Sequence, residues 1–195
     1  IYSIFEQSLQ YKSKAMYELQ QAGEQSYYIN SPAKIGIYRQ NDTDIYLIDS
    51  GNDKEAVKKI IKIAAAQNWK IKGIINTHSN ADHIGGNAYL QAQIDCPVFA
   101  NGIEAAFTQY PILEPSFLYG GYPCKELRSK FLLAKESQTL PFTDKDFPRE
   151  LEIIPLAGHF FDMVGFRTPD DTVFLADCIS SESTLNKYQV SFIYD

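Results

Sequence analysis

The sequence has few cysteines, no long apolar runs and no excess of basic residues. Its three cysteines, Cys96, Cys124 and Cys178, are odd in number, widely spaced and without a CxxC pair. This usage argues against a disulfide framework and for reduced thiols, so we expect a cytoplasmic protein. The longest apolar runs, such as IIKIAAA, are far shorter than the roughly 20 residues of a bilayer span, and the N-terminus lacks the basic-then-apolar order of a secretory signal. We therefore predict a soluble protein without membrane contact.

The charge balance also narrows the choice of partners. A formal net charge of −6 makes nucleic acid an unfavourable partner, although a bound dication would reverse the sign locally. The hydrophobic content is 45% and the aromatic content 13% in 195 residues, which is enough for a real core and fits one domain. The expected partner is therefore a small-molecule substrate.

Hydrophobic periodicity predicts alternating strands and helices. Residues 1–22 suggest an amphipathic helix before Gly23, but Met16 is equally a natural start, with 1–15 a leader or an added segment. In residues 53–69 the apolar positions follow helical spacing, which predicts a helix packed on a sheet. A further helix is predicted from Ile84. The predicted strands are 26–30, 34–40, 44–51, 70–77, 96–101, 151–159, 162–168, 172–178 and 187–195.

Two other stretches complete the organisation. Residues 111–146 are rich in aromatics, prolines and charges without a clear period, and we interpret them as an insertion or lid. The domain is therefore predicted to span 23–195. The stretch INTHSNADHIGG, residues 75–86, leaves the C-terminal end of a predicted strand, where α/β sheets generally bind ligands. Imidazoles and a carboxylate so close together are typical of a metal site.

Two later segments complete a pattern with this cluster. His159 ends the predicted strand 151–159, and Asp177 lies near the end of strand 172–178. The series T-H-x-x-x-D-H-x-G-G, then G-H after a strand, then a strand ending in Asp, resembles the metallo-β-lactamase superfamily of hydrolases, over roughly residues 27–195. The resemblance implies an α/β fold of the αββα sandwich type, with the metal site at the shared edge of two sheets.

The resemblance also implies roles for individual residues. A first metal site would use His78, His159 and the position now held by Asn80. The second site would use Asp82 and His83, and Asp177 would bridge the two ions. Asp82 would also be catalytic, because it orients the metal-bound hydroxide. The implied cofactor is zinc, as one or two ions, with iron or manganese as alternatives.

Two departures from the family pattern are evident. Asn80 replaces the second histidine of the usual H-x-H-x-D-H, and the distal histidine of the second site is absent among the three histidines of the sequence. Because the helix and strand that carry it would follow Asp195, we expect the domain to be C-terminally incomplete. A second copy of the chain or a C-terminal fragment would then cover the open sheet edge.

The implied function is hydrolysis of a small ester, thioester, amide or phosphoester by a metal-bound hydroxide. The glyoxalase II-like branch fits better than a true β-lactamase, because Asp177 stands where the latter more often place cysteine or another residue. Asn80 motivates an alternative, a non-catalytic binding or regulatory module with a degenerate metal site. An oxygen-handling iron protein is a third reading, but it would normally be fused to a flavin domain.

Some residues also have plainer interpretations. Asn80 is more simply a turn residue bonded to the backbone than a weak ligand. Cys178 follows Asp177 in a predicted strand, where neighbours face opposite sides, so a buried thiol is expected. Gly85 and Gly86 either let the backbone approach the site or shape a helix entry. The aromatic residues that either line a substrate pocket or simply pack are Phe117, Tyr119 and Tyr122.

Overall fold

The computed structural model describes residues 16–129, 131–180 and 182–189. Its larger sheet has six strands in the order β1-β2-β3-β4-β5-β6. The first four strands are antiparallel neighbours, whereas β5 and β6 run parallel to β4. The bounds are β1 Leu19–Gln21, β2 Ser26–Ile29, β3 Ile35–Arg39, β4 Asp44–Ile48, β5 Lys70–Ile75 and β6 Val98–Phe99. The second sheet is an antiparallel set of β7 Glu152–Pro155, β8 Val164–Arg167 and β9 Val173–Phe174.

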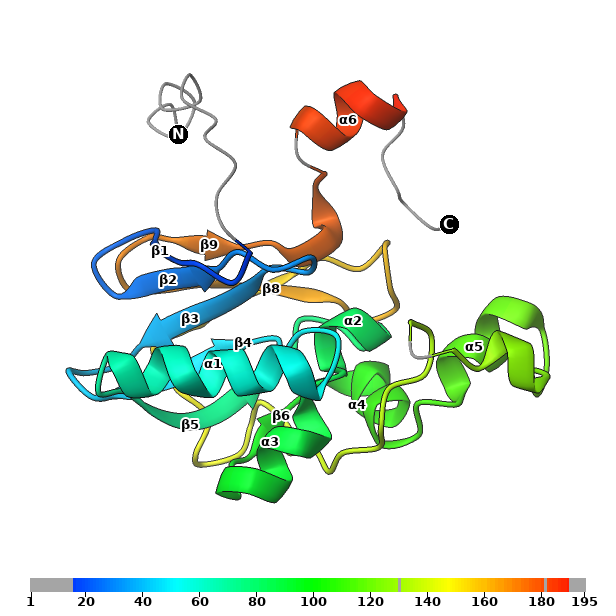
Figure 1. Ribbon diagram of the computed structural model, residues 1–195, viewed down its shortest axis with the longest axis horizontal. Coiled ribbons are helices and arrows are strands. Elements are labelled where there is room, and N and C mark those ends of the chain that lie inside the picture. The colour runs from blue at the N-terminus through cyan, green and yellow to red at the C-terminus, as the bar shows by residue number, and fades with distance from the viewer. Residues whose placement is uncertain (1–15, 130, 181, 190–195) are drawn as a thin grey trace.

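The helices lie mostly in the connections around the parallel strands (Figure 1). They are α1 Lys54–Ala66, α2 Ala81–Ile84, α3 Asn87–Ile94, α4 Gly102–Gln109, α5 Leu113–Tyr119 and α6 Glu182–Tyr188, with short 3-10 helices η1 Lys125–Leu127 and η2 Ala176–Cys178. The N-terminus of α1 is capped by Asp53, whose side chain accepts hydrogen bonds from the backbone N–H groups of Glu55 and Ala56. In the part of the chain that the structure describes, every helix is too short or too polar to cross a membrane.

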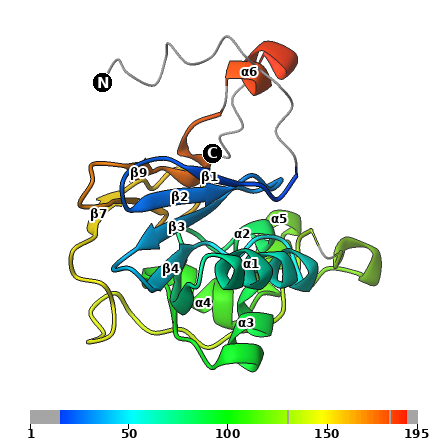
Figure 2. The same cartoon turned by 60° about the vertical axis from the view of Figure 1, so that its left-hand side comes forward.

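The larger sheet is buried on both faces, and the two-residue period of its strands shows this directly. In β4, Ile45 and Leu47 join the core cluster that includes Val57 and Ile60 of α1. The alternate residues of β4, Tyr46 and Ile48, join a second cluster. That second cluster also contains Val164 and Phe166 of β8, so it lies between the two sheets. The resulting layers are helix, sheet and sheet: α1 lies in front and β8 behind in Figure 1, and in Figure 2 β7 and β9 lie to the left of α1.

A polar contact joins the edges of the two sheets. Asp170, in the turn between β8 and β9, accepts hydrogen bonds from the Gln25 backbone N–H at 2.7 Å and from the Ser26 hydroxyl at 2.8 Å. The Thr168 hydroxyl adds a third bond at 2.5 Å. These bonds tie the β8–β9 turn to the start of β2. Burial opposes the charge of this carboxylate, but the hydrogen bonds outweigh it and lower the pKa of Asp170 to about 2.

The structure near the two ends of the described chain corrects two predictions. The predicted helix over 1–22 is wrong at its end, because residues 19–21 pair with 27–29 of β2 as strand β1. Residues 1–15 lie outside the described residues. The predicted strand over 187–195 is wrong for its first residues, because Lys187 and Tyr188 end α6, where backbone groups bond within the helix turn. The remaining residues of that prediction, 190–195, lie outside the described part.

The predicted insertion or lid over 111–146 divides into two parts. Its first part carries α5 and η1 at the periphery of the molecule (Figure 1). Its last part belongs to the core, since Leu140 bridges Phe99 of β6 and Phe142 is buried against Phe147 and Phe166. Only the first part is therefore placed where a lid could act.

Candidate metal centre

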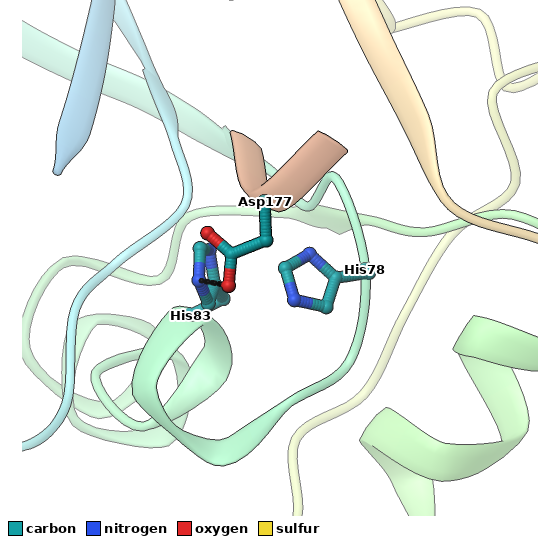
Figure 3. Close-up of side chains that lie close together, drawn as sticks. All are labelled: His78, His83 and Asp177. Atoms are coloured by element: carbon teal, nitrogen blue, oxygen red, sulfur yellow. Dashed lines mark ion pairs between the residues drawn. The ribbon is translucent and has the colours of Figure 1, made fainter. Parts of the chain in front are cut away.

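The predicted metal ligands converge at one edge of the two sheets. His78 lies on the loop after β5, and His83 lies in the short helix α2. His159 comes from the loop between β7 and β8, and Asp177 from η2 after β9. The carboxylate of Asp177 points toward His83, with the imidazole of His78 on its other side (Figure 3). Side chains separated by about a hundred residues are thus neighbours, as the sequence predicts.

The tightest group consists of His78, His83 and Asp177, whose ligand atoms all lie within 4.8 Å of one another. Asp177 Oδ2 is 3.4 Å from His83 Nε2 and 3.6 Å from His159 Nε2. The imidazole centroids of His78 and His159 are 5.1 Å apart. Asp82 Oδ2 lies 3.8 Å from His83 Nε2. All five predicted ligands are therefore adjacent, and their division between two metal sites stays a prediction.

Asp49, at the end of β4, fixes the orientation of two imidazoles. Its Oδ2 lies 2.8 Å from His83 Nδ1 and accepts the Thr77 hydroxyl at 2.7 Å. Because the Thr77 hydroxyl hydrogen is used by Asp49, its oxygen accepts the Nδ1 hydrogen of His78, at 3.0 Å. In their neutral form, both rings then direct the lone pair of Nε2 toward the centre. A carboxylate behind a histidine is the usual arrangement around metal ligands.

The ionisation of these groups is strongly perturbed. Burial opposes a charge on His83, but Asp49 and Asp177 outweigh it and hold the pKa of His83 well above its usual value. Burial, with the neighbouring His83, holds the pKa of His78 well below its usual value. Although burial opposes it, the close contact with His83 and the charges of the nearby histidines lower the pKa of Asp177 to about 2. The centre therefore holds a permanent negative charge beside neutral or protonated imidazoles.

This arrangement fits a transition-metal ion. Within the described residues, the buried Nε2 atoms of His78 and His83 make no hydrogen bond of ordinary geometry, and His83 Nε2 instead faces Asp177 Oδ2 at 3.4 Å. Buried polar atoms rarely lack a hydrogen bond, and here both nitrogens face the same carboxylate. Neutral imidazole nitrogen and carboxylate oxygen are the donor types that zinc prefers. His78, His83 and Asp177 would hold the ion, with His159 and Asp82 close enough to complete the coordination.

Asn80 is occupied by a contact that the sequence does not reveal. Its side-chain amide donates to Oε1 of Glu114 at 2.8 Å, and the Ala81 N–H donates to Oε2 of Glu114 at 3.0 Å. The expected bond from Asn80 to the backbone is wrong, because Asn80 makes no capping bond to α2 and Glu114 of α5 serves that helix end instead. Burial raises the pKa of the Glu114 carboxyl to about 7, against these two hydrogen bonds.

A second buried glutamate joins two ligand loops. Glu104 of α4 accepts hydrogen bonds from the Ser79 backbone at 2.9 Å and hydroxyl at 2.5 Å, and from the Asp162 backbone N–H at 2.9 Å. Ser79 adjoins His78, and Asp162 lies in the loop that carries His159. Neither glutamate was predicted from the sequence, because each lies in a helix without a motif. Asp49 lies near the end of the predicted strand 44–51, within the span of the family resemblance, so it offered a weak signal.

A pocket of about 580 Å³ opens beside the metal ligands. Its polar lining comes from Asn80, Asp82, Glu114, His159 and Asp177. Of the aromatic residues predicted to line a pocket, Phe117 does so, whereas Tyr119 and Tyr122 are largely exposed and lie outside the lining. The rest of the lining is apolar and includes Leu118, Phe131, Leu132, Phe160 and Phe161.

Two smaller predictions can also be compared with the structure. Cys178 is exposed, so the prediction of a buried thiol is wrong. The alternation of a strand does not apply there, because Ala176–Cys178 is a 3-10 helix and β9 ends at Phe174. Gly85 and Gly86 pack against the backbone oxygens of Asn52 and Ser50, which a Cβ would meet at 2.1 and 2.5 Å. They shape the helix entry by close packing on this loop.

Comparisons with known proteins agree with this fold. The family model of the metallo-beta-lactamase superfamily matches residues 32–176. The structure of VMB-1 aligns with a TM-score of 0.61 at 15% identity, covering 91% of this chain and 87% of VMB-1. BJP-1, a subclass B3 metallo-beta-lactamase of Bradyrhizobium japonicum, aligns with a TM-score of 0.58 at 18% identity, covering 84% of this chain and 64% of BJP-1. The predicted fold is confirmed.

One curated relative is named as a nuclease. Exodeoxyribonuclease YycJ of Bacillus anthracis is 34% identical over 65 residues, which is 33% of this chain and 25% of that relative. The chain spans a quarter of this relative and 57–64% of three matched solved structures. These matches therefore describe a shared architecture.

Proposed function

Because the chain belongs to the metallo-β-lactamase superfamily, we propose that it is a metal-dependent hydrolase of a small ester, thioester, amide or phosphoester. The observation that carries the proposal is the group of His78, His83 and Asp177, with two buried imidazole nitrogens facing one carboxylate. We propose zinc as the ion, a place in the glyoxalase II-like branch, and a cytoplasmic location.

The residues have distinct roles in this proposal. A zinc ion held by these residues would supply Lewis acidity and would lower the pKa of water from 15.7 to about 7. Asp82 lines the pocket with its side chain about half exposed, so it can accept a hydrogen bond from the attacking water and hold it toward the substrate. The water oxygen bonds to the substrate carbonyl carbon, the bond to the leaving group breaks, and the proton passes through Asp82 to the leaving group.

Asp49 and Thr77 keep the two imidazoles in the tautomer that can bind metal. Glu104 and Glu114 hold the loops that carry the ligands. Such fixed positions are what catalysis by orientation requires. A phosphodiester is the second candidate substrate, because Exodeoxyribonuclease YycJ is a partial relative.

Metal analysis tests this proposal. Full-length protein purified without chelator should contain about one zinc, iron or manganese ion per chain and should slowly hydrolyse a generic ester. His83→Ala should lose both metal and turnover, because Nε2 is central to the group. Asp42→Asn, which alters a fully exposed carboxylate, is the matched control and should keep both. Protein without metal, even after incubation with zinc, would favour the binding-module alternative.

A further inference from the structure

We propose that the substrate is an uncharged carboxylic ester with an apolar acyl chain, bound with that chain in the phenylalanine-lined pocket. This inference rests on the proposed hydrolase function and specifies its substrate class. It is carried by the chemistry of the pocket that adjoins the metal ligands. The pocket volume of about 580 Å³ is in the range of small-molecule sites, which is about 300–1,000 Å³.

The apolar part of this pocket is a connected group of aromatic rings. Phe160 makes an edge-to-face contact with Phe161 at a centroid distance of 5.2 Å, and Phe117 lies 5.0 Å from Phe161. Phe160 also lies 6.4 Å from the imidazole of His78. The apolar wall therefore begins directly at a predicted metal ligand and continues outward to α5.

The outer members of this wall remain exposed to water. The exposed fraction is 54% for Phe117, 41% for Leu118, 41% for Phe161 and 64% for Phe131. Clustered apolar exposure of this kind is uncommon on a soluble protein unless the surface binds something. Because the same residues line the pocket beside the metal ligands, an apolar part of the substrate is the occupant that the site accommodates.

The charge of the pocket argues against the phosphodiester. The described lining residues include three carboxylates, Asp82, Glu114 and Asp177, and no lysine or arginine. Proteins that bind nucleic acid neutralise phosphates with such cations. One dication would offset two of these three carboxylates and would leave no positive surface for a charged chain. An uncharged ester needs no cationic side chains in the pocket.

The two halves of an ester also differ in where they fit. Asp82 and Asp177 keep about half of their side-chain surface exposed, at 47% and 45%, so the site is open to water on their side. The departing alcohol gains charge as its bond breaks and takes a proton, and therefore belongs on this open side. The acyl group then extends among Phe117, Phe160 and Phe161. Water adds to the carbonyl carbon, and the products are the apolar carboxylic acid and the alcohol.

A chain-length series tests the proposal. Zinc-loaded full-length protein is assayed with p-nitrophenyl acetate, p-nitrophenyl octanoate and bis(p-nitrophenyl) phosphate. Burial of one methylene contributes about fourfold in binding, so even partial burial of the longer chain should raise kcat/KM for octanoate at least about tenfold over acetate. The phosphodiester should be the poorest substrate. Titration of the metal-free protein with the neutral fluorophore N-phenylnaphthylamine provides a second readout, and saturable binding is expected.

Variants at the exposed rings connect both readouts to this pocket. Phe117→Ala combined with Phe161→Ala should lower the octanoate-to-acetate ratio at least about fivefold and weaken fluorophore binding by a similar factor. Phe161→Leu, which keeps an apolar side chain, should retain most of the ratio. Tyr110→Ala removes an aromatic ring that is 63% exposed outside the pocket and should change neither readout. Thermal unfolding of each variant confirms that it is folded.

The outcomes separate this inference from the proposed function. Hydrolysis of acetate without preference for octanoate would overturn the substrate class and leave the hydrolase in place. Faster hydrolysis of the phosphodiester, or a ratio that the double variant leaves unchanged, would also overturn it. No hydrolysis of any substrate by the metal-loaded protein would overturn the hydrolase and this inference together.

Discussion

Replacing Asp49 by Asn should weaken metal binding without touching a metal ligand. Asp49 accepts three hydrogen bonds: Oδ1 from the Thr77 backbone N–H at 2.9 Å, and Oδ2 from the Thr77 hydroxyl at 2.7 Å and from His83 Nδ1 at 2.8 Å. Asp49 has a φ of 66°, and Asn tolerates this left-handed region well. The substitution therefore changes the chemistry of one side-chain atom with little backbone strain.

An amide offers one acceptor oxygen and one NH₂ donor where the carboxylate offered two acceptors. If NH₂ faces His83, the ring must accept at Nδ1 and carry its proton on Nε2, which then cannot bind metal. Loss of such a supporting partner typically costs 10–100-fold in metal affinity, or about 1.4–2.7 kcal/mol. If NH₂ faces the Thr77 N–H instead, two donors oppose each other in a buried site, which costs about 1–3 kcal/mol of folding stability.

Both quantities can be measured on the same preparation. Competition with a chromophoric chelator at fixed pH gives the zinc affinity, and urea unfolding of the metal-free protein gives the stability. Asp42→Asn makes the same chemical change at an exposed position and should alter neither quantity by more than experimental error. If Asp49→Asn bound zinc as tightly as the wild type and was equally stable, the role assigned to Asp49 would be refuted.

Three further predictions concern buried or hydrogen-bonded carboxylates. Glu104→Ala should lower the free energy of unfolding by about 2–4 kcal/mol in urea titrations, because Ser79 and Asp162 lose a buried acceptor; a change below about 0.5 kcal/mol would contradict this. The pKa of Asp170 is lowered to about 2, so its contribution of about 1 kcal/mol to the free energy of unfolding is present above pH 4 and is lost as the pH falls toward about 2. In acid unfolding curves, Asp170→Asn should remove this dependence of stability on pH. Burial raises the pKa of Glu114 to about 7, so metal-free wild type should lose stability as the pH rises from about 4.5 to about 7; parallel thermal-unfolding profiles for wild type and Glu114→Gln would disprove this.

Much of the fold is predictable because its strands have a strict two-residue period or a continuous apolar run. Both faces of β4 are buried, and the apolar stripe of residues 53–69 becomes α1. The failures have a tertiary cause. Residues 19–21 pair with β2, which helical spacing in the sequence cannot reveal. The short helix α4 was not predicted, because eight residues give too little periodicity to distinguish a helix from a loop.

The convergence of the predicted metal ligands could be foreseen because histidine is rare in this sequence and the order of the residues is specific. His78, His83, His159 and Asp177 follow strand ends, and the ends of neighbouring strands meet at one edge. The supporting carboxylates of Glu104 and Glu114 could not be predicted from the sequence, since a glutamate in a helix is ordinarily a solvated surface residue. Only the packing of α4 and α5 against the ligand loops buries them.

The contact between Asn80 and Glu114 changes how the departure from the family pattern is interpreted. Judged from the sequence alone, an Asn in place of a metal-binding histidine suggests the simple loss of one metal ligand. In the structure the amide supplies a donor to a carboxylate that is only 4% exposed and that also accepts from the Ala81 N–H. A buried carboxylate without donors is costly, so the two residues stabilise each other. The glutamate in turn secures the start of α2, which carries His83. Asn80 therefore supports a predicted metal ligand through the helix end.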